Sequence, residues 1–122
     1  MIAHSRYRQT QTDTASRERV LLLLLQKAQA CMALADAGLA AGNPCESVTQ
    51  LQRALDIVAE LCDSLDAARA PVMADNLGAV YGFVMQRLLV AQKGDRKALK
   101  EAQRAFGPVA DAFEQAVAAA AR

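Results

Sequence analysis

Apolar residues recur at spacings of three and four along most of this chain, and this period constrains the fold more than any other feature. A helix turns by about 100° per residue, so residues with these spacings share one helical face. The clearest stripe has gaps of 3, 4, 3, 4 and 3 and comprises Val48, Leu51, Leu55, Val58, Cys62 and Leu65. Similar stripes before and after it predict a protein built from amphipathic helices.

Length and composition support a single helical domain. The chain has 122 residues, of which 53% are hydrophobic and only 4% aromatic. That length suits one domain with a real core. Strands favour aromatic and β-branched residues, whereas this chain is dominated by Ala and Leu. We therefore expect an all-α fold.

Start and stop signals place the first two helices. Ser16 is a suitable N-cap for a first helix that begins near Arg17, and Gly42-Asn43 ends it. Asn43 is also a good N-cap for a second helix, because Pro44 then occupies the first helical position. The polar, aperiodic residues 1–15 are expected to form a mobile N-terminal segment before the bundle domain of residues 16–122.

Two more helices follow from the same kind of signal. Pro71 can open a third helix that ends at Lys93-Gly94, and Asp95 can cap a fourth. Gly107-Pro108 should kink or break the fourth helix, and a complete break would make a fifth. Short connections make neighbouring helices antiparallel, so the expected architecture is an antiparallel up-down four-helix bundle.

The residues offer no catalytic, cofactor-binding or metal site. The only histidine is His4 in the polar N-terminal segment, so no helix supplies a base for a serine or cysteine nucleophile. The Glu-x-x-His pairs of two-metal bundles are also absent. Three cysteines are an odd count without a CxxC pair, which favours free thiols in a reducing cytosol. A net charge of +1 gives no reason to expect nucleic-acid binding. We expect a protein that is not an enzyme.

A run of aliphatic residues, Val20–Leu25, suggests an interaction surface. It is too short to span a membrane, and Asp13 and Glu18 precede it, so neither membrane insertion nor a signal peptide is expected and the chain should be cytoplasmic. Six consecutive residues pass more than once around a helix, leaving Leu22, Leu23 or Leu25 outside any single stripe. Exposed apolar residues of this kind mark binding sites, unless neighbouring helices bury the run on several sides.

Small residues on the predicted third helix form a second candidate surface. Ala74, Gly78 and Gly82 recur every four residues, and a helix pays about 1 kcal/mol for an internal glycine relative to alanine. Such a ridge lets another helix approach closely. That helix could belong to a partner or to the bundle itself.

The order of short motifs resembles that of the flagellar secretion chaperones of the FliS family. Near the start of the chain, Tyr7 is followed by the motif Thr14-Ala15-Ser16. Residues 57–66 match a motif of the family's second helix. The predicted third helix contains two more matching motifs, Ala74–Tyr81 and Arg87-Leu88-Leu89. The match covers nearly the whole chain. It departs from the family where Leu24-Leu25-Gln26-Lys27-Ala28 replaces Leu-Tyr-Asp-Gly-Ala, and where Phe113 replaces the usual tryptophan, as in a divergent member.

The resemblance implies a cytosolic export chaperone. Family members hold the disordered C-terminal segment of flagellin as short helices in apolar grooves, which prevents premature polymerisation before type III flagellar export. The flagellar export gate is a further candidate partner, and a monomer or weak dimer is expected. Alternatives are a helical adaptor for another flagellar or secretion protein, or a bundle that associates with itself.

The resemblance also implies a set of cargo-binding residues. Asn76 stands in a family motif, where its amide could pair with cargo backbone, although a solvated helix residue is the alternative. Tyr81 could contact cargo or be a core residue with its hydroxyl at the edge. Tyr7 would be a removable plug over the binding surface. The full set is Tyr7, Leu22, Leu25, Asn76, Val80, Tyr81 and Met85.

Overall fold

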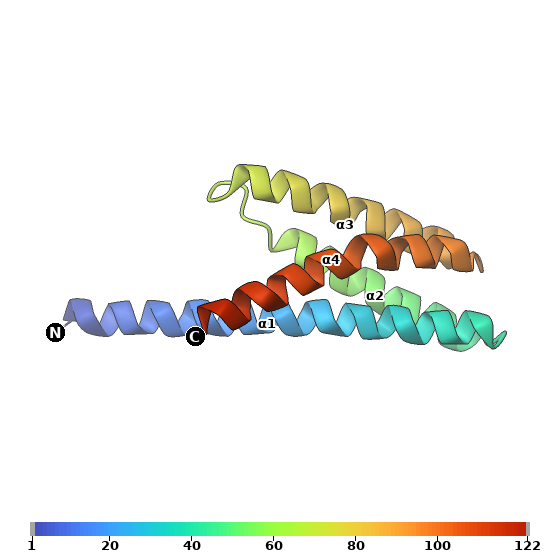
Figure 1. The fold of residues 1–122 in the computed structure, drawn as a ribbon, viewed down its shortest axis with the longest axis horizontal. Helices are drawn as coiled ribbons and strands as arrows, with labels where there is room; N and C mark the ends of the chain where they lie inside the picture. The colour runs from blue at the N-terminus through green and yellow to red at the C-terminus, as the bar shows by residue number, and fades with distance from the viewer. Residues whose placement is uncertain (1, 122) are drawn as a thin grey trace.

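The chain folds into a bundle of four antiparallel helices (Figure 1). The computed structural model describes the backbone of residues 2–121 and the side chains of residues 16–121. Within that backbone the elements are α1 (Ile2–Ala40), α2 (Pro44–Asp63), α3 (Pro71–Ala91) and α4 (Arg96–Ala120), without any strand. Each helix packs on two neighbours, α1 and α3 both contacting α2 and α4. The predicted all-α up-down bundle is confirmed.

The two side-chain caps predicted at connections between helices are confirmed, and α3 begins at Pro71 as predicted. The Asn43 side chain accepts a hydrogen bond from the Glu46 N–H at 3.3 Å, and the Asp95 side chain accepts one from the Ala98 N–H at 3.2 Å. Each bond satisfies an N–H that has no partner inside its helix. Gly42 ends α1 with a φ of +68°, a conformation that glycine adopts without steric cost. Local sequence thus fixes where the chain turns.

The start of α1 differs from the prediction. The helix begins at Ile2, so Ser16 lies inside it and does not cap it. Residues 2–15 contain neither Pro nor Gly, and a suitable cap residue cannot end a helix when the preceding residues also accept helical geometry. The side chains of residues 1–15, including Tyr7, lie outside the described residues, so the mobility predicted for this segment stays a prediction.

The interruption predicted at Gly107-Pro108 takes the form of a bend. α4 continues through Pro108 as one helix, and a fifth helix does not form in the described backbone. Figure 1 shows the axis of α4 changing direction near its middle. Proline has no N–H to donate to the preceding turn and crowds its carbonyl, which accounts for a bend here.

The core runs along the centre of the bundle and draws on all four helices. Phe106 of α4 is fully buried, and its ring centroid lies 6.4 Å from that of Tyr81 on α3. The predicted stripe on α2 is wrong at one position, because Val48 is exposed and the buried face is rotated toward Ser47 and Gln50. The largest fully buried apolar side chains are Leu25, Met32, Leu51, Val58, Val84, Leu88, Leu99 and Phe106.

A charged cluster joins α1 to the first turns of α4. Asp36 accepts hydrogen bonds from the Arg96 Nε at 2.8 Å and the Lys100 Nζ at 2.9 Å. The hydrogen bond from Arg96, followed by that from Lys100, lowers the pKa of the Asp36 carboxyl from 3.8 to about 2. The cluster therefore favours the ionised carboxylate of the folded chain.

This shift predicts a pH-dependent loss of stability in an Asp36→Asn variant. A carboxyl with a lowered pKa stabilises the fold fully above its ordinary pKa of 3.8, and that contribution disappears as the pH falls through about 2. Both cations are half-exposed, so we expect the variant to lose only about 1 kcal/mol at neutral pH, and much less near pH 2. Urea unfolding at both pH values measures the difference. An equal loss at both would show that the ion pairs are not its source.

Candidate functional site

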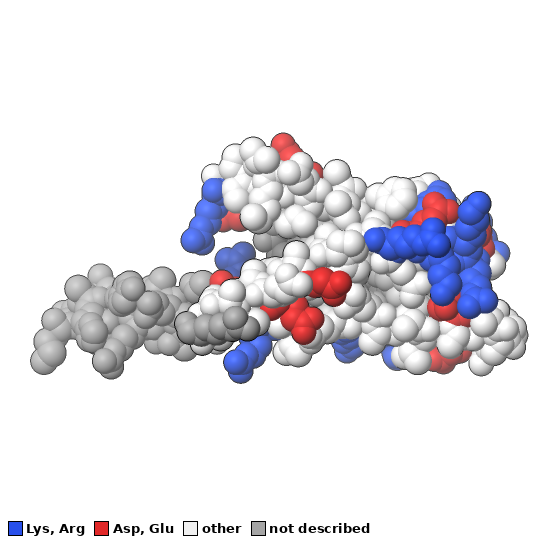
Figure 2. Space-filling model, in the orientation of Figure 1, with Lys and Arg blue, Asp and Glu red and all other residues white. Residues whose placement is uncertain are grey.

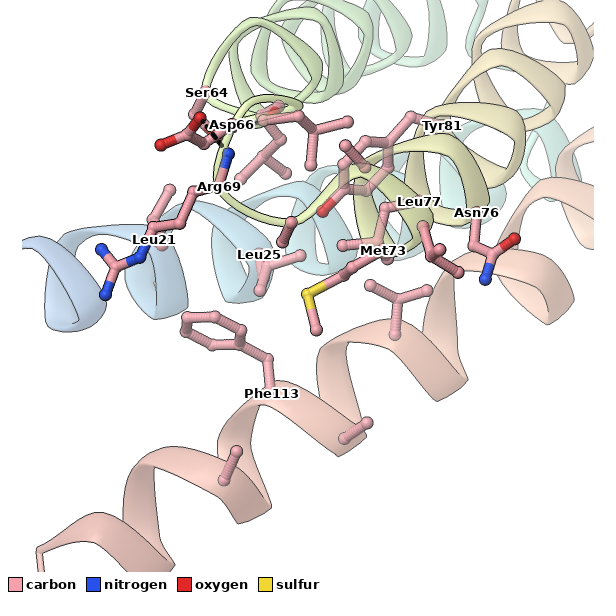
Figure 3. Close-up of a pocket in the computed structure, with 18 of the residues that line it drawn as sticks. Leu21, Leu25, Ser64, Asp66, Arg69, Met73, Asn76, Leu77, Tyr81 and Phe113 are labelled. Carbon is pink, nitrogen blue, oxygen red and sulfur yellow. Dashed lines mark hydrogen bonds between the residues drawn. The ribbon is translucent and has the colours of Figure 1, made fainter.

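An apolar groove of about 900 Å³ lies at one end of the bundle (Figure 3). It opens between the start of α3 and the second half of α4, and its floor comes from α1 and the end of α2. We call this feature the groove. Its lining comprises Leu21, Leu25, Leu61, Ser64, Leu65, Asp66, Arg69, Ala70, Val72, Met73, Ala74, Asn76, Leu77, Tyr81, Pro108, Val109, Ala112, Phe113 and Ala116.

The groove arises because α3 and α4 separate along their length. Figure 1 shows the two helices close together at the turn that joins them and apart at the opposite end, where α4 leans toward α1. Pro108 lies on the groove wall. It stands inside α4, and a proline inside a helix bends the helix axis. The bend thus keeps the second half of α4 from closing over the core next to α3.

Two apolar side chains face one another across the opening. In Figure 3, Met73 from α3 and Phe113 from α4 point into the space between their helices. Met73 is 62% exposed, and its neighbour Val72 is still more exposed, although both are large and apolar. Phe113 is half-buried against the core. Contiguous exposed apolar surface of this kind is typical of a binding site.

Tyr81 supplies a polar group to an otherwise apolar wall. The residue is only 4% exposed, and its hydroxyl points into the groove (Figure 3). Burial, and secondarily the nearby Cys62 thiol, raise the pKa of the Tyr81 phenol above its ordinary value of 10.0. The hydroxyl therefore keeps its proton at physiological pH and can donate a hydrogen bond to a ligand.

The remaining polar groups lie on the rim. Asp66 accepts a hydrogen bond from the backbone N–H of Arg69 at 3.0 Å, which holds the α2–α3 connection in a turn. The Ser64 hydroxyl is already bonded to the Leu61 carbonyl at 2.6 Å. Asn76 is exposed on α3. A few polar groups around an apolar floor can orient a ligand that binds mainly by apolar burial.

The structure brings together three of the seven predicted cargo residues. Leu25, Asn76 and Tyr81 line the groove, although Leu25 and Tyr81 also belong to the buried core. The others do not line it: Leu22 is half-buried on α1, and Val80 and Met85 pack against the core from α3. The Tyr7 side chain lies outside the described residues. A role in cargo binding stays a prediction for all seven.

The aliphatic run of α1 divides between core, groove and surface. Leu25 is buried, Leu21 lines the groove, and Leu23 is 58% exposed together with Val20. Leu23 is therefore the leucine of this run that the bundle leaves exposed, whereas Leu25 belongs to the core.

The small-residue ridge of α3 does not act as a close helix contact along its whole length. A Cβ at Gly78 would lie 3.7 Å from the Leu65 side chain, an ordinary packing distance. A Cβ at Gly82 would have no neighbour within 4 Å. Packing within the described bundle thus leaves room for a small side chain at both positions and does not require a glycine at either.

Sequence reasoning missed the residues that form the mouth of the groove. Met73 lies four residues before Leu77 and so continues the apolar face of α3 that Leu77 and Tyr81 share, whereas Val72, directly after Pro71, lies off that face. The available signal was that two large apolar residues stand next to each other, so that they cannot both lie on one narrow helical face. Val109 and Phe113 follow Phe106 at helical spacing on α4, but only the separation of the helices shows that they face the groove.

A metal site and a membrane-spanning helix are two further possibilities for the described part of the chain. No group of His, Cys, Asp and Glu side chains among the described residues could hold a metal ion. Ser16–Ala40 of α1 is long and apolar enough to cross a membrane, because small residues continue the apolar character beyond Gln26-Lys27. The core helix of a globular bundle meets the same criterion, and Leu25 and Met32 lie in the core.

Comparison with known proteins identifies a relationship that covers almost the entire chain. The sequence pattern of the family described as flagellar protein FliS matches residues 1–120. A comparison with curated proteins finds no match.

Proposed function

We propose that the groove binds the disordered C-terminal segment of flagellin, because this chain belongs to the FliS family of flagellar export chaperones. The family is one of chaperones and not of enzymes. The observation that carries the proposal is the apolar groove between α3 and α4, with Met73 and Phe113 exposed to a ligand. Binding would keep flagellin from polymerising in the cytoplasm until type III export.

The dimensions of the groove suit a short amphipathic helix. One turn of helix with its side chains occupies about 400 Å³, so a volume of about 900 Å³ accommodates roughly two turns. A disordered segment that folds on binding must offset its ordering entropy by burying apolar surface. The groove provides that surface through side chains that are already accessible to a ligand in the free chain, namely Val72, Met73 and Phe113.

Polar groups would set the position of the bound helix. The Tyr81 hydroxyl can donate to a carbonyl at the end of a cargo helix, where backbone carbonyls lack partners. The Asn76 amide on the rim can both donate and accept. These two contacts would favour one register of the cargo over a slip along the apolar floor.

We extend the proposal to Tyr7, which would cover part of the binding surface until cargo displaces it. A Tyr7→Ala variant should then keep its helical content and bind flagellin more tightly, because cargo no longer competes with the plug. Calorimetry on wild type and variant measures the change, and circular dichroism checks the fold. Equal affinities would remove this role from Tyr7.

The direct test is fluorescence anisotropy with a labelled peptide comprising the last several dozen residues of the cognate flagellin. We expect saturable binding with one peptide per chain, and no comparable binding of a peptide from the N-terminal part of flagellin. If neither peptide binds while the bundle stays helical, the groove serves another protein. That outcome would favour the alternative of an adaptor for another flagellar or secretion protein, including the export gate.

A further inference from the structure

The outward face of α1 carries a second apolar stripe, which the bundle leaves uncovered. Its members recur at gaps of 3, 4, 3, 4 and 3, the spacing of a coiled-coil seam, and each of them is exposed. The large apolar members Val20, Leu23 and Leu34 are 54%, 58% and 50% exposed. We call the following residues the α1 stripe: Val20, Leu23, Lys27, Ala30, Leu34 and Ala37.

The core of the bundle does not account for the α1 stripe. At about 100° per residue, the stripe lies on the side of α1 away from the buried Ala28 and Met32. Only 28% of the most apolar 18-residue stretch of Ser16–Ala40 is buried. The stripe residues do not line the groove either. Surface that stays apolar over several turns outside the core is typical of an interaction site.

The charges on and beside the α1 stripe favour an acidic partner on one flank. Lys27 lies within the stripe, and Arg19 is exposed next to it. On the side of α4, Asp36 is held between Arg96 and Lys100. These four cations outnumber the Asp36 carboxylate by three charges, so this flank attracts negative charge.

The flank on the side of α2 has the opposite character. α2 packs along that side of α1 and exposes mainly acids. A partner with carboxylates on both flanks would meet these acids, and a second copy of the α1 stripe would bring cations against cations. Glu18 of α1 is half-buried on the side of the helix that Leu25 shares, and so lies off the stripe. The exposed charges of α2 are Glu46, Arg53, Asp56, Glu60 and Asp63.

We propose that the α1 stripe binds an amphipathic helix of a partner protein that carries its carboxylates on the flank facing α4. Ala30 and Ala37 are small, so the backbone of the partner can come close and its own large aliphatic side chains fit over the alanines. Lys27 fixes the register, because only one alignment places an acid of the partner opposite it. The proposal does not depend on what the groove binds.

The length of the contact sets the expected affinity. From Val20 to Ala37 the stripe extends about 26 Å, and a strip about 10 Å wide covers about 260 Å² on each partner. Stable complexes bury about 800 Å² per partner. We therefore expect a complex of micromolar affinity that dissociates readily and that salt weakens.

A protein helix fits the α1 stripe better than an anionic membrane does. A membrane binds a helix through the apolar area that enters the lipid, and two of the six stripe positions are alanines. A flat anionic surface would also lie against the acids of α2 as well as against the cations of the stripe. A narrow partner helix avoids both costs.

Fluorescence anisotropy of the full chain with two labelled helical peptides tests the proposal. Each peptide has about three heptads with Leu at the stripe positions and Gln along one flank; the other flank carries Glu in one peptide and Lys in the other. In about 50 mM salt we expect the Glu peptide to bind with a dissociation constant of about 10–100 μM, and the Lys peptide to bind at least about tenfold more weakly.

Two pairs of variants locate the bound peptide. Leu34→Glu should weaken binding of the Glu peptide at least about tenfold, because it places a carboxylate in the apolar seam. Leu89→Glu on α3, similarly exposed but outside the stripe, should stay within about threefold of wild type. Lys27→Glu should also weaken binding about tenfold. Lys93→Glu makes the same change in net charge at the basic end of the bundle, where α3 turns into α4 (Figure 2), and should have little effect.

Circular dichroism confirms that every variant folds, and four results would overturn the proposal. The first is a Glu peptide that does not bind at about 1 mM chain, and the second is equal binding of the Glu and Lys peptides. The third is weakening by Lys93→Glu, or by Met73→Glu in the groove, as large as that by Leu34→Glu, since the peptide would then lie elsewhere. The fourth is binding to vesicles of about one-third phosphatidylserine that Leu34→Glu abolishes, because the stripe would then be a membrane surface.

Discussion

A Met73→Glu variant should bind the C-terminal segment of flagellin about a hundredfold more weakly than wild type. Met73 is exposed in the free chain, so a glutamate there remains solvated and the bundle should fold normally. Once cargo covers the groove, the carboxylate would lose solvent and be buried against a mainly apolar lining. The cost therefore appears in the complex and not in the free protein. Calorimetric titration of both chains with the same peptide measures the change.

Leu89→Glu is a matched control for that variant. Leu89 lies on the same helix, is 53% exposed, and does not line the groove. It should bind the segment within about threefold of wild type, because exposed substitutions away from a binding surface have small effects. If Met73→Glu and Leu89→Glu weaken binding equally, or if neither weakens it, cargo does not occupy the groove.

A Phe106→Ala variant should lose about 3–5 kcal/mol of unfolding free energy. Phe106 is fully buried, where α4 packs against Tyr81 of α3. Truncation removes its apolar contacts and leaves a cavity that a helix crossing can only partly close. Domains of this kind are stable by only 5–15 kcal/mol, so the variant loses a large share of its stability. Urea unfolding followed by circular dichroism measures the loss.

Phe106→Leu is the milder companion substitution, because it keeps most of the apolar volume. It should cost less than half as much as Phe106→Ala. A loss below about 1 kcal/mol for Phe106→Ala would show that α3 and α4 are not packed tightly around this ring. Such a result would also weaken the account of the groove, since the same contact fixes Tyr81 on its wall.

Local chemistry made much of the fold predictable. Asn43 and Asp95 signal helix starts through side-chain bonds that involve only the next three residues, so sequence alone identifies them. The start of α1 could not be read in this way, because Ser16 resembles a cap whether or not the preceding turn is helical. Val48 shows a related limit: a stripe defines a helix face only to within a residue or so, and neighbouring helices choose the face.

The groove was predictable only in part. The surplus of apolar residues was visible in Val20–Leu25, and Tyr81 was noted as a core residue with a polar edge. α3 is apolar around much of its circumference, so its sequence did not distinguish Met73, which lies at the mouth, from Met85, which packs against the core. Which methionine faces the groove depends on where α4 bends away from α3 at Pro108. The packing of two helices therefore decides it, and the sequence of α3 alone does not.

Calorimetry of the wild-type chain with the C-terminal segment of flagellin, repeated at several temperatures, tests the central claim most directly. The account predicts one segment bound per chain with a strongly negative heat-capacity change, because the apolar groove is covered as the segment folds. The absence of binding at micromolar concentrations at every temperature, in a chain that is still helical by circular dichroism, would contradict it.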